Sequence, residues 1–146
     1  MQTPFDAPST PRSTEDTSPV RVLLVEDDLD LAEVMAEFLS IAGLDVRTAL
    51  SGHEALEVAP PFRPHLVLCD LNLPDIGGLE VVRQLRSISS TARSYIVILT
   101  AMARMAPTPH ETEEPGVDAF ICKPISIEAV RTLVEEVGRR RRNSHL

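Results

Sequence analysis

The chain has 146 residues, of which 43% are hydrophobic and 25% charged, as in an ordinary globular domain with one core. Its formal net charge of −8 argues against general nucleic-acid binding, which requires a basic face. No apolar run approaches the roughly 20 residues of a membrane helix, and no signal-peptide pattern begins the chain, so we expect a cytoplasmic protein without membrane contact.

Residues 1–19 are rich in Pro, Ser and Thr and poor in large apolar side chains. Such a segment buries too little surface to offset its ordering entropy, so we expect a disordered N-terminal tail. The remaining residues divide into one domain over 20–140 and a short C-terminal tail over 141–146.

Five apolar runs alternate with helical patterns between residues 20 and 140. The first helical pattern spaces apolar residues from Leu31 through Val34 to Ala42 and stops at Gly43. A second helix opens with the capping box Ser51 to Glu54, and a third follows the Gly77-Gly78 pair. The strands are expected at residues 20–25, 44–50, 66–70, 95–100 and 117–122.

Prolines limit the length of two of the predicted helices. Pro60, Pro61 and Pro64 are expected to end the second helix. The proline-rich segment 102–115 excludes a long helix between the fourth and fifth strands, and its cap and first-turn Pro predict a short helix over 109–114. A last helix begins after Ser126 and ends in the arginines 139–142, whose charges complement the helix dipole.

This alternation predicts an α/β fold, with a five-stranded parallel sheet and helices on both faces. We assign it the strand order 2-1-3-4-5 of flavodoxin-like, doubly wound sheets. In that order strands 1 and 3 are neighbours at the topological switch point, where such folds place their functional groups.

Chemistry-bearing side chains occur where four of the five strands end. They are Glu26 and Asp27, Asp70, Thr100, and Lys123, which is the chain's only lysine. Carboxylates crowded into one pocket repel by roughly 4 kcal/mol per pair at 4 Å, so they must become protonated, be neutralised by other charges or hold a cation. Oxygen ligands favour Mg²⁺, and Lys123 would add a second positive charge.

Each of these residues alone has a simple structural explanation. Asp70 could cap a turn, Thr100 could be an ordinary strand residue, and Lys123 could be a solvated charge. Their joint position at strand ends favours a site instead. A carboxylate there can act as a nucleophile and form an aspartyl-phosphate, with the surrounding charges neutralising the phosphoryl oxygens.

The order and spacing of these motifs resemble the CheY-like response-regulator receiver domain of bacterial two-component signalling. The resemblance covers about residues 20–140. It is carried by Leu24-Val25-Glu26-Asp27-Asp28, Asp70-Leu71-Asn72-Leu73-Pro74, Gly77-Gly78, Leu99-Thr100-Ala101 and Lys123-Pro124.

The resemblance implies that Asp70 accepts a phosphoryl group from a histidine kinase or a histidine phosphotransfer protein. Asp27, Asp70 and the Asn72 backbone carbonyl would then ligate Mg²⁺, and Glu26 would bind it through water. Thr100 and Lys123 would assist at the phosphoryl group, and Phe120 would take the aromatic switch position, passing the change to a downstream protein or output domain. Asp28 is expected to cap the first helix. The chain would not be an enzyme beyond phosphorylation and dephosphorylation of its own Asp70.

Other interpretations stay open at this level. The chain is either a stand-alone regulator or a receiver cut from a longer protein. A receiver-like interaction module could work without phosphorylation.

A Mg²⁺-dependent aspartyl phosphohydrolase would need an acid two residues after its nucleophile, where this chain has Asn72. A flavodoxin-like cofactor site would need a phosphate loop, and Glu26 to Asp28 would repel a phosphate. The segment 102–115 departs from the family's regular fourth helix, which puts dimerisation through that face in doubt.

Overall fold

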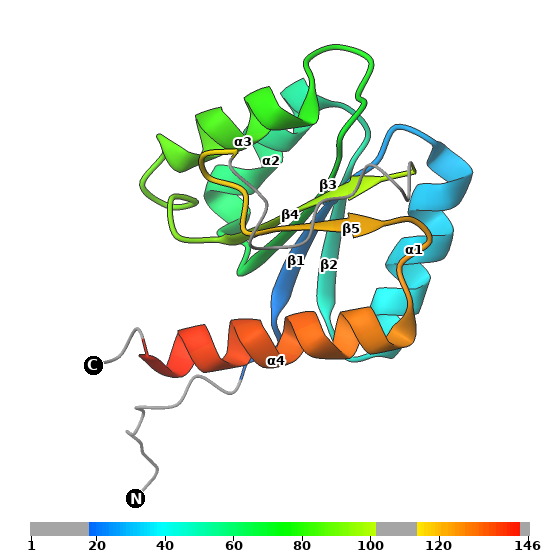
Figure 1. Cartoon of the computed structure of the whole chain (residues 1–146), viewed down its shortest axis with the longest axis vertical. Coiled ribbons are helices and arrows are strands. Elements are labelled where there is room, and N and C mark those ends of the chain that lie inside the picture. The colour runs from blue at the N-terminus through cyan, green and yellow to red at the C-terminus, as the bar shows by residue number, and fades with distance from the viewer. Residues whose placement is uncertain (1–17, 102–113, 144–146) are drawn as a thin grey trace, which may run out of the picture.

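The computed structural model describes residues 18–101 and 114–143, and the structural statements below concern these two ranges. Five parallel strands form one sheet in the order β2-β1-β3-β4-β5, which confirms the predicted fold class and strand order (Figure 1). The strands are β1 (Arg21–Val25), β2 (Asp45–Ala49), β3 (Leu66–Asp70), β4 (Tyr95–Thr100) and β5 (Ala119–Cys122).

Four described helices cover the two faces of this sheet (Figure 1). Helices α1 and α4 pack on one face, and α2 and α3 pack on the other. Their bounds are α1 (Leu29–Ile41), α2 (Gly52–Phe62), α3 (Gly78–Arg86) and α4 (Ile127–Asn143). None of these described helices combines the length and apolar character needed to cross a bilayer.

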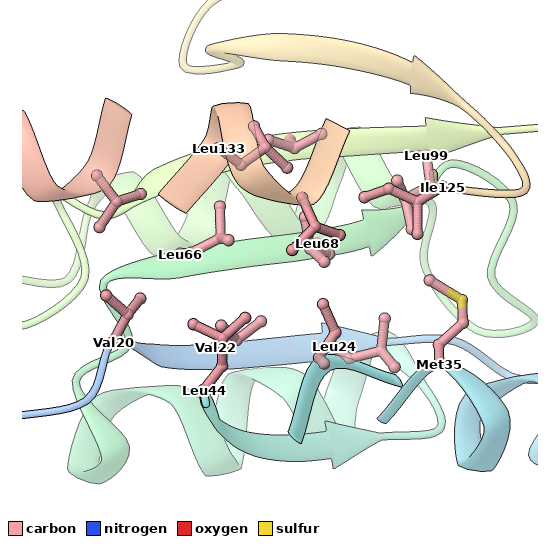
Figure 2. Close-up of a cluster of buried hydrophobic side chains, with 14 of the residues drawn as sticks. Val20, Val22, Leu24, Met35, Leu44, Leu66, Leu68, Leu99, Ile125 and Leu133 are labelled. Carbon is pink, nitrogen blue, oxygen red and sulfur yellow. The ribbon is translucent and has the colours of Figure 1, made fainter. Parts of the chain in front are cut away.

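The alternation of side chains along the strands produces two separate cores. In β1, Leu23 and Val25 face the α2–α3 side, whereas Val22 and Leu24 face the α1–α4 side. Figure 2 shows the second of these cores, where side chains of β1 and β3 meet Leu133 from α4. Because every residue of β3 is buried, this central strand is fixed from both faces, as the apolar run predicts.

The end of α2 differs from the sequence prediction. Pro60 and Pro61 do not terminate the helix but lie inside its last turn. The helix runs on to Phe62, which is buried, and ends at Arg63 in a left-handed conformation with φ of 55°. The fixed φ of proline suits a helix, so burial of Phe62 outweighs the loss of backbone donors.

Helix α1 buries a narrower face than its apolar spacing predicts. Ala32, Met35 and Leu39 are buried, but Val34 is 64% exposed and Ala42 is also exposed. The apolar spacing alone therefore overestimates the buried face of α1, because the helix contacts the sheet along one narrow stripe.

Parts of three predictions fall outside the described ranges. Residues 102–113 include nearly all of the expected helix over 109–114, and residues 1–17 include most of the expected N-terminal tail. Residues 144–146 lie outside as well. Helix α4 continues to Asn143, so the domain boundary expected at residue 140 falls within a helix.

Gly78 allows the start of α3 to approach the carboxyl end of β3. A Cβ atom at this position would overlap the backbone carbonyl oxygen of Asp70 and come within 3.1 Å of Leu71 Cα. The Gly78 N–H donates to the Leu71 carbonyl at 2.9 Å. Because these neighbouring atoms belong to the backbone, they cannot move away from an added Cβ as the end of a flexible side chain could.

We expect Gly78→Ala to lower the free energy of unfolding by about 1–3 kcal/mol, because the added methyl displaces backbone at the end of β3. Gly77→Ser is the matched control: a Cβ there meets nothing within 4 Å. Gly77 is the N-cap of α3 and has no side-chain cap, so Ser should stabilise the helix slightly, by roughly 0.3 kcal/mol. Urea denaturation measures both changes, and a Gly78→Ala variant as stable as the wild type would contradict the close-packing argument.

Candidate functional site

Three carboxylates meet at the carboxyl ends of β1 and β3. Oxygen atoms of Glu26, Asp27 and Asp70 all lie within 4.8 Å of one another. Strands β1 and β3 are neighbours with Val25 opposite Cys69, so the residues that follow them emerge side by side. The structure thus brings together the acidic residues that the strand-end pattern singled out.

Lys123 reaches this cluster from the far end of the sequence. Its Nζ lies 2.9 Å from Glu26 Oε1 and 3.6 Å from Asp70 Oδ2, and its side chain is only 16% exposed. The backbone N–H of Lys123 donates to the Thr100 carbonyl at 2.8 Å, which holds the end of β5 beside the end of β4. The single lysine of the chain therefore contacts two of the three acids.

Glu26 is the most enclosed member of the cluster. Its side chain is 2% exposed, and both carboxylate oxygens accept hydrogen bonds. Lys123 donates to Oε1, and the Asp28 backbone N–H donates to Oε2 at 3.1 Å. Asp28 itself accepts from the Leu31 N–H at 3.2 Å, so it caps α1 as predicted. Asp27, between them, is exposed.

Asp70 ends β3 and is 7% exposed. Burial raises the pKa of its carboxyl above the ordinary value, against the opposing effect of the Lys123 charge. The negative charge of Glu26 raises this pKa further, whereas a hydrogen bond from the Asn72 backbone lowers it, and Asp27 adds a smaller increase. The site thus destabilises the ionised form of the Asp70 carboxyl. Nearby positive charge is what offsets this destabilisation best.

The pKa of Lys123 is raised despite its burial. Loss of solvent alone would lower this pKa, because burial disfavours the ammonium. The hydrogen bond to Glu26 and the charges of Asp70 and Glu26 outweigh that effect. Lys123 therefore stays positively charged within the site at neutral pH.

The other predicted residues surround this centre. Thr100 is buried at the end of β4, where it pairs with Cys122. Phe120 lies two register positions earlier on β5, opposite Ile98, and packs partly buried against the core on the α2–α3 side. Asn72 is exposed in the loop after β3, two residues beyond Asp70.

Asp75 is a positioning residue that the sequence reasoning missed. Its carboxylate accepts from the backbone N–H groups of Gly52 at 2.9 Å and His53 at 2.7 Å, at the start of α2. These backbone hydrogen bonds hold the pKa of Asp75 well below its usual range. Asp75 thereby ties the loop after β3 to α2. The only sequence signal is an acid directly after Pro74, which reads as an ordinary turn.

The thiol next to the acidic cluster has low reactivity at neutral pH. Cys69 is buried on β3, and burial, together with the negative charges of Asp70 and Glu26, raises the pKa of its thiol to about 12. It therefore remains protonated and weakly nucleophilic at neutral pH. Asp70 is the side chain that this end of β3 contributes to the acidic cluster.

The donor set fits a hard divalent cation. Three carboxylates against one ammonium leave two uncompensated negative charges, and every donor is an oxygen. Mg²⁺ prefers oxygen ligands and keeps several waters, using one or two carboxylates directly. Partial exposure at Asp27 leaves room for those waters, so the residues present suit Mg²⁺.

Comparisons with known proteins agree with this geometry. Residues 22–135 match the family model described as the response regulator receiver domain. Over 122 residues, 34% are identical to the response regulator MprA of Mycolicibacterium vanbaalenii, a match that covers 84% of this chain and 52% of that protein. The chain therefore spans about half the length of this relative.

Solved structures share the fold. The receiver domain (CheY-like) from Methylobacillus flagellatus is 29% identical with a TM-score of 0.73, covering 82% of this chain and 99% of that one. The response regulator TrrA from Thermotoga maritima, solved in complex with Mg(2+)-BeF, is 26% identical with a TM-score of 0.68. That second match covers 81% of this chain and 98% of that one.

We expect Asp70→Asn to raise the free energy of unfolding at pH 7 without metal, by on the order of 1 kcal/mol, because it removes a destabilised anion. A carboxyl with a raised folded-state pKa loses stability as pH rises. The gain should therefore shrink as the pH falls and disappear below pH 3.8, the ordinary Asp value, because the acid then becomes protonated in both states. Urea denaturation in EDTA across this range measures it. Asp45→Asn, at an exposed acid on β2, should change little, and equal effects at both sites would contradict the argument.

Proposed function

The chain belongs to the response regulator receiver domain family of two-component signalling, and from that membership we propose that Asp70 is its phosphoacceptor. One observation carries this proposal: Asp70 lies within 4.8 Å of the acidic pair after β1 and 3.6 Å from the Lys123 ammonium. A nucleophile beside both a cluster of acids and a fixed cation suits phosphoryl transfer, which depends mainly on positioning and charge neutralisation.

We propose that Asp27, Asp70 and the backbone carbonyl of Asn72 hold Mg²⁺, with Glu26 contributing through water. Bound there, Mg²⁺ would supply positive charge opposite the oxygens of the transferring phosphoryl group. The all-oxygen donor set of Glu26, Asp27 and Asp70 supports this assignment. So does the structural relative TrrA, described in complex with Mg(2+)-BeF.

In the proposed transfer, an Asp70 carboxylate oxygen bonds to phosphorus while the phosphorus–nitrogen bond of a phosphohistidine breaks. The bonding electrons leave with the donor imidazole. Lys123, already beside Asp70, would bind one of the phosphoryl oxygens, and the Thr100 hydroxyl would bind another. Phe120, packed between strand and helices, would relay the resulting shift to a partner-binding face.

The proposed partners follow from this chemistry. A histidine kinase or histidine phosphotransfer protein would supply the phosphoryl group in the cytoplasm. The target would be a separate protein or an output domain outside this sequence, because MprA is about twice as long as the matched region. The receiver family leaves the phosphohydrolase alternative unsupported, and Asn72 provides no acid for a leaving group. A receiver module that works without phosphorylation has no specific observation in its favour.

Acetyl phosphate with Mg²⁺ should add one phosphoryl group to the wild-type chain and none to Asp70→Asn, because only a carboxylate forms the acyl phosphate. Intact mass spectrometry detects the addition directly. Asp28→Asn is the matched control: it removes an acid of the same cluster region, while Asn caps α1 as well as Asp does. Labelling of Asp70→Asn at the wild-type level would refute the assignment.

We expect Lys123→Met to tighten Mg²⁺ binding by about tenfold, equivalent to about 1.4 kcal/mol, because it removes the charge that competes for Glu26 and Asp70. Isothermal titration with MgCl₂ measures the change. Arg131→Gln removes an exposed positive charge on α4 and controls for net charge. Weaker Mg²⁺ binding in Lys123→Met would mean that the lysine supports the metal site rather than competing with it.

A further inference from the structure

A second charged site lies at the opposite edge of the sheet, where the strands begin. A cavity of about 400 Å³ opens between the start of β1, the segments before β3 and β4, and the C-terminal half of α4. Its lining contains no carboxylate but includes five arginines and one histidine: Arg21, Arg63, His65, Arg93, Arg140 and Arg141. This concentration stands out in a chain whose net charge is −8.

The fold, rather than one run of sequence, gathers these arginines. Arg21 begins β1, Arg63 caps α2, Arg93 precedes β4, and Arg140 and Arg141 belong to the last turns of α4. Like charges from separate elements repel when they converge. Such an arrangement is typical of a surface that binds an anion.

Arg21 is held in place while its charge stays available. Its Nε donates to the carbonyls of Phe62 at 3.0 Å and Arg63 at 2.9 Å. Its backbone N–H donates to His65 Nδ1 at 2.9 Å, which orients that ring at the cavity. Among the described residues, the terminal Nη groups of Arg21 form no hydrogen bond, so they can meet a ligand.

The five arginines differ in the hydrogen bonds and ion pairs that their guanidinium groups already form within the protein. Arg140 is compensated, since its guanidinium lies over the Tyr95 ring at 4.7 Å and pairs with Glu136 at 3.0 Å. Arg141 donates to the Ser18 carbonyl at 3.1 Å. Within residues 18–101 and 114–143, the remaining three, Arg21, Arg63 and Arg93, form no ion pair with a carboxylate.

We propose that this cavity binds a small anion carrying two or more phosphoryl groups, such as pyrophosphate, a longer polyphosphate or a nucleoside di- or triphosphate. Guanidinium groups bind phosphate oxygens in bidentate pairs, and several guanidiniums on different walls require several phosphoryl groups. The volume lies within the range of about 300–1,000 Å³ typical of small-molecule sites. A concave pocket of this size favours a small ligand over a nucleic-acid strand.

This site is independent of the phosphoacceptor. The arginine-lined cavity lies at the amino ends of the strands, whereas Asp70 lies at the opposite, carboxyl end of β3. The cavity offers no carboxylate to hold a metal, so binding should not require Mg²⁺. A test can therefore exclude the Asp70 site by chelating metal.

The test is isothermal titration of the full chain with sodium pyrophosphate in EDTA at fixed ionic strength. We expect saturable binding with one site, at least about tenfold tighter than orthophosphate. Arg63→Gln/Arg93→Gln should weaken pyrophosphate binding by at least about tenfold, and both side chains are exposed, so folding should survive. Arg83→Gln/Arg131→Gln removes the same charge from exposed positions outside the cavity and should leave binding nearly unchanged.

Parallel titrations with tripolyphosphate and ATP distinguish the sources of this chemistry. Tighter binding of ATP identifies a nucleotide, and equal binding identifies the phosphate chain alone; either result supports the site. The Asp70→Asn variant should bind pyrophosphate like the wild type. Absence of saturable binding, equal binding of orthophosphate, or equal loss in the two double variants would overturn the proposal. So would binding of a single-stranded oligonucleotide that pyrophosphate does not displace.

Discussion

The contact of Lys123 with Glu26 and Asp70 is the constraint on which the rest of this site depends. Carboxylates so close together repel, and two of the three are buried, so the fold needs a positive charge among them. The lysine supplies part of that charge and leaves a deficit that suits a divalent cation. One ammonium thus stabilises the three acids without neutralising all of their charge.

The sheet explains how residues nearly a hundred positions apart meet. Parallel strands in the order β2-β1-β3-β4-β5 place all carboxyl ends on one edge, and cores on both faces fix each strand in register. The two edges carry opposite charge: acids after β1 and β3, and an arginine-lined cavity where the strands begin. Helix α4 connects them, since it begins shortly after Lys123 and ends beside that cavity.

The sequence predicts those features that depend on local pattern. Apolar runs locate the strands, and the polar residues that end them identify Asp70 as a neighbour of Glu26 and Asp27 once the strand order is assigned. Features that depend on packing were not predictable. Pro60 and Pro61 stay helical because Phe62 is buried, and Asp75 binds the start of α2 through backbone N–H groups that no pattern shows. The arginine-lined cavity was not predictable either, because its arginines come from separate elements that only the fold brings together.

The proposed metal ion would bind among Glu26, Asp27 and Asp70. Mn²⁺-induced broadening of backbone amide NMR signals locates such an ion directly. Substoichiometric Mn²⁺ should selectively broaden the signals that follow β1 and β3, together with those near Thr100 and Lys123, and excess Mg²⁺ should restore them. Broadening centred on exposed acids of α1 or α4, with the signals around Asp70 unaffected, would contradict the account.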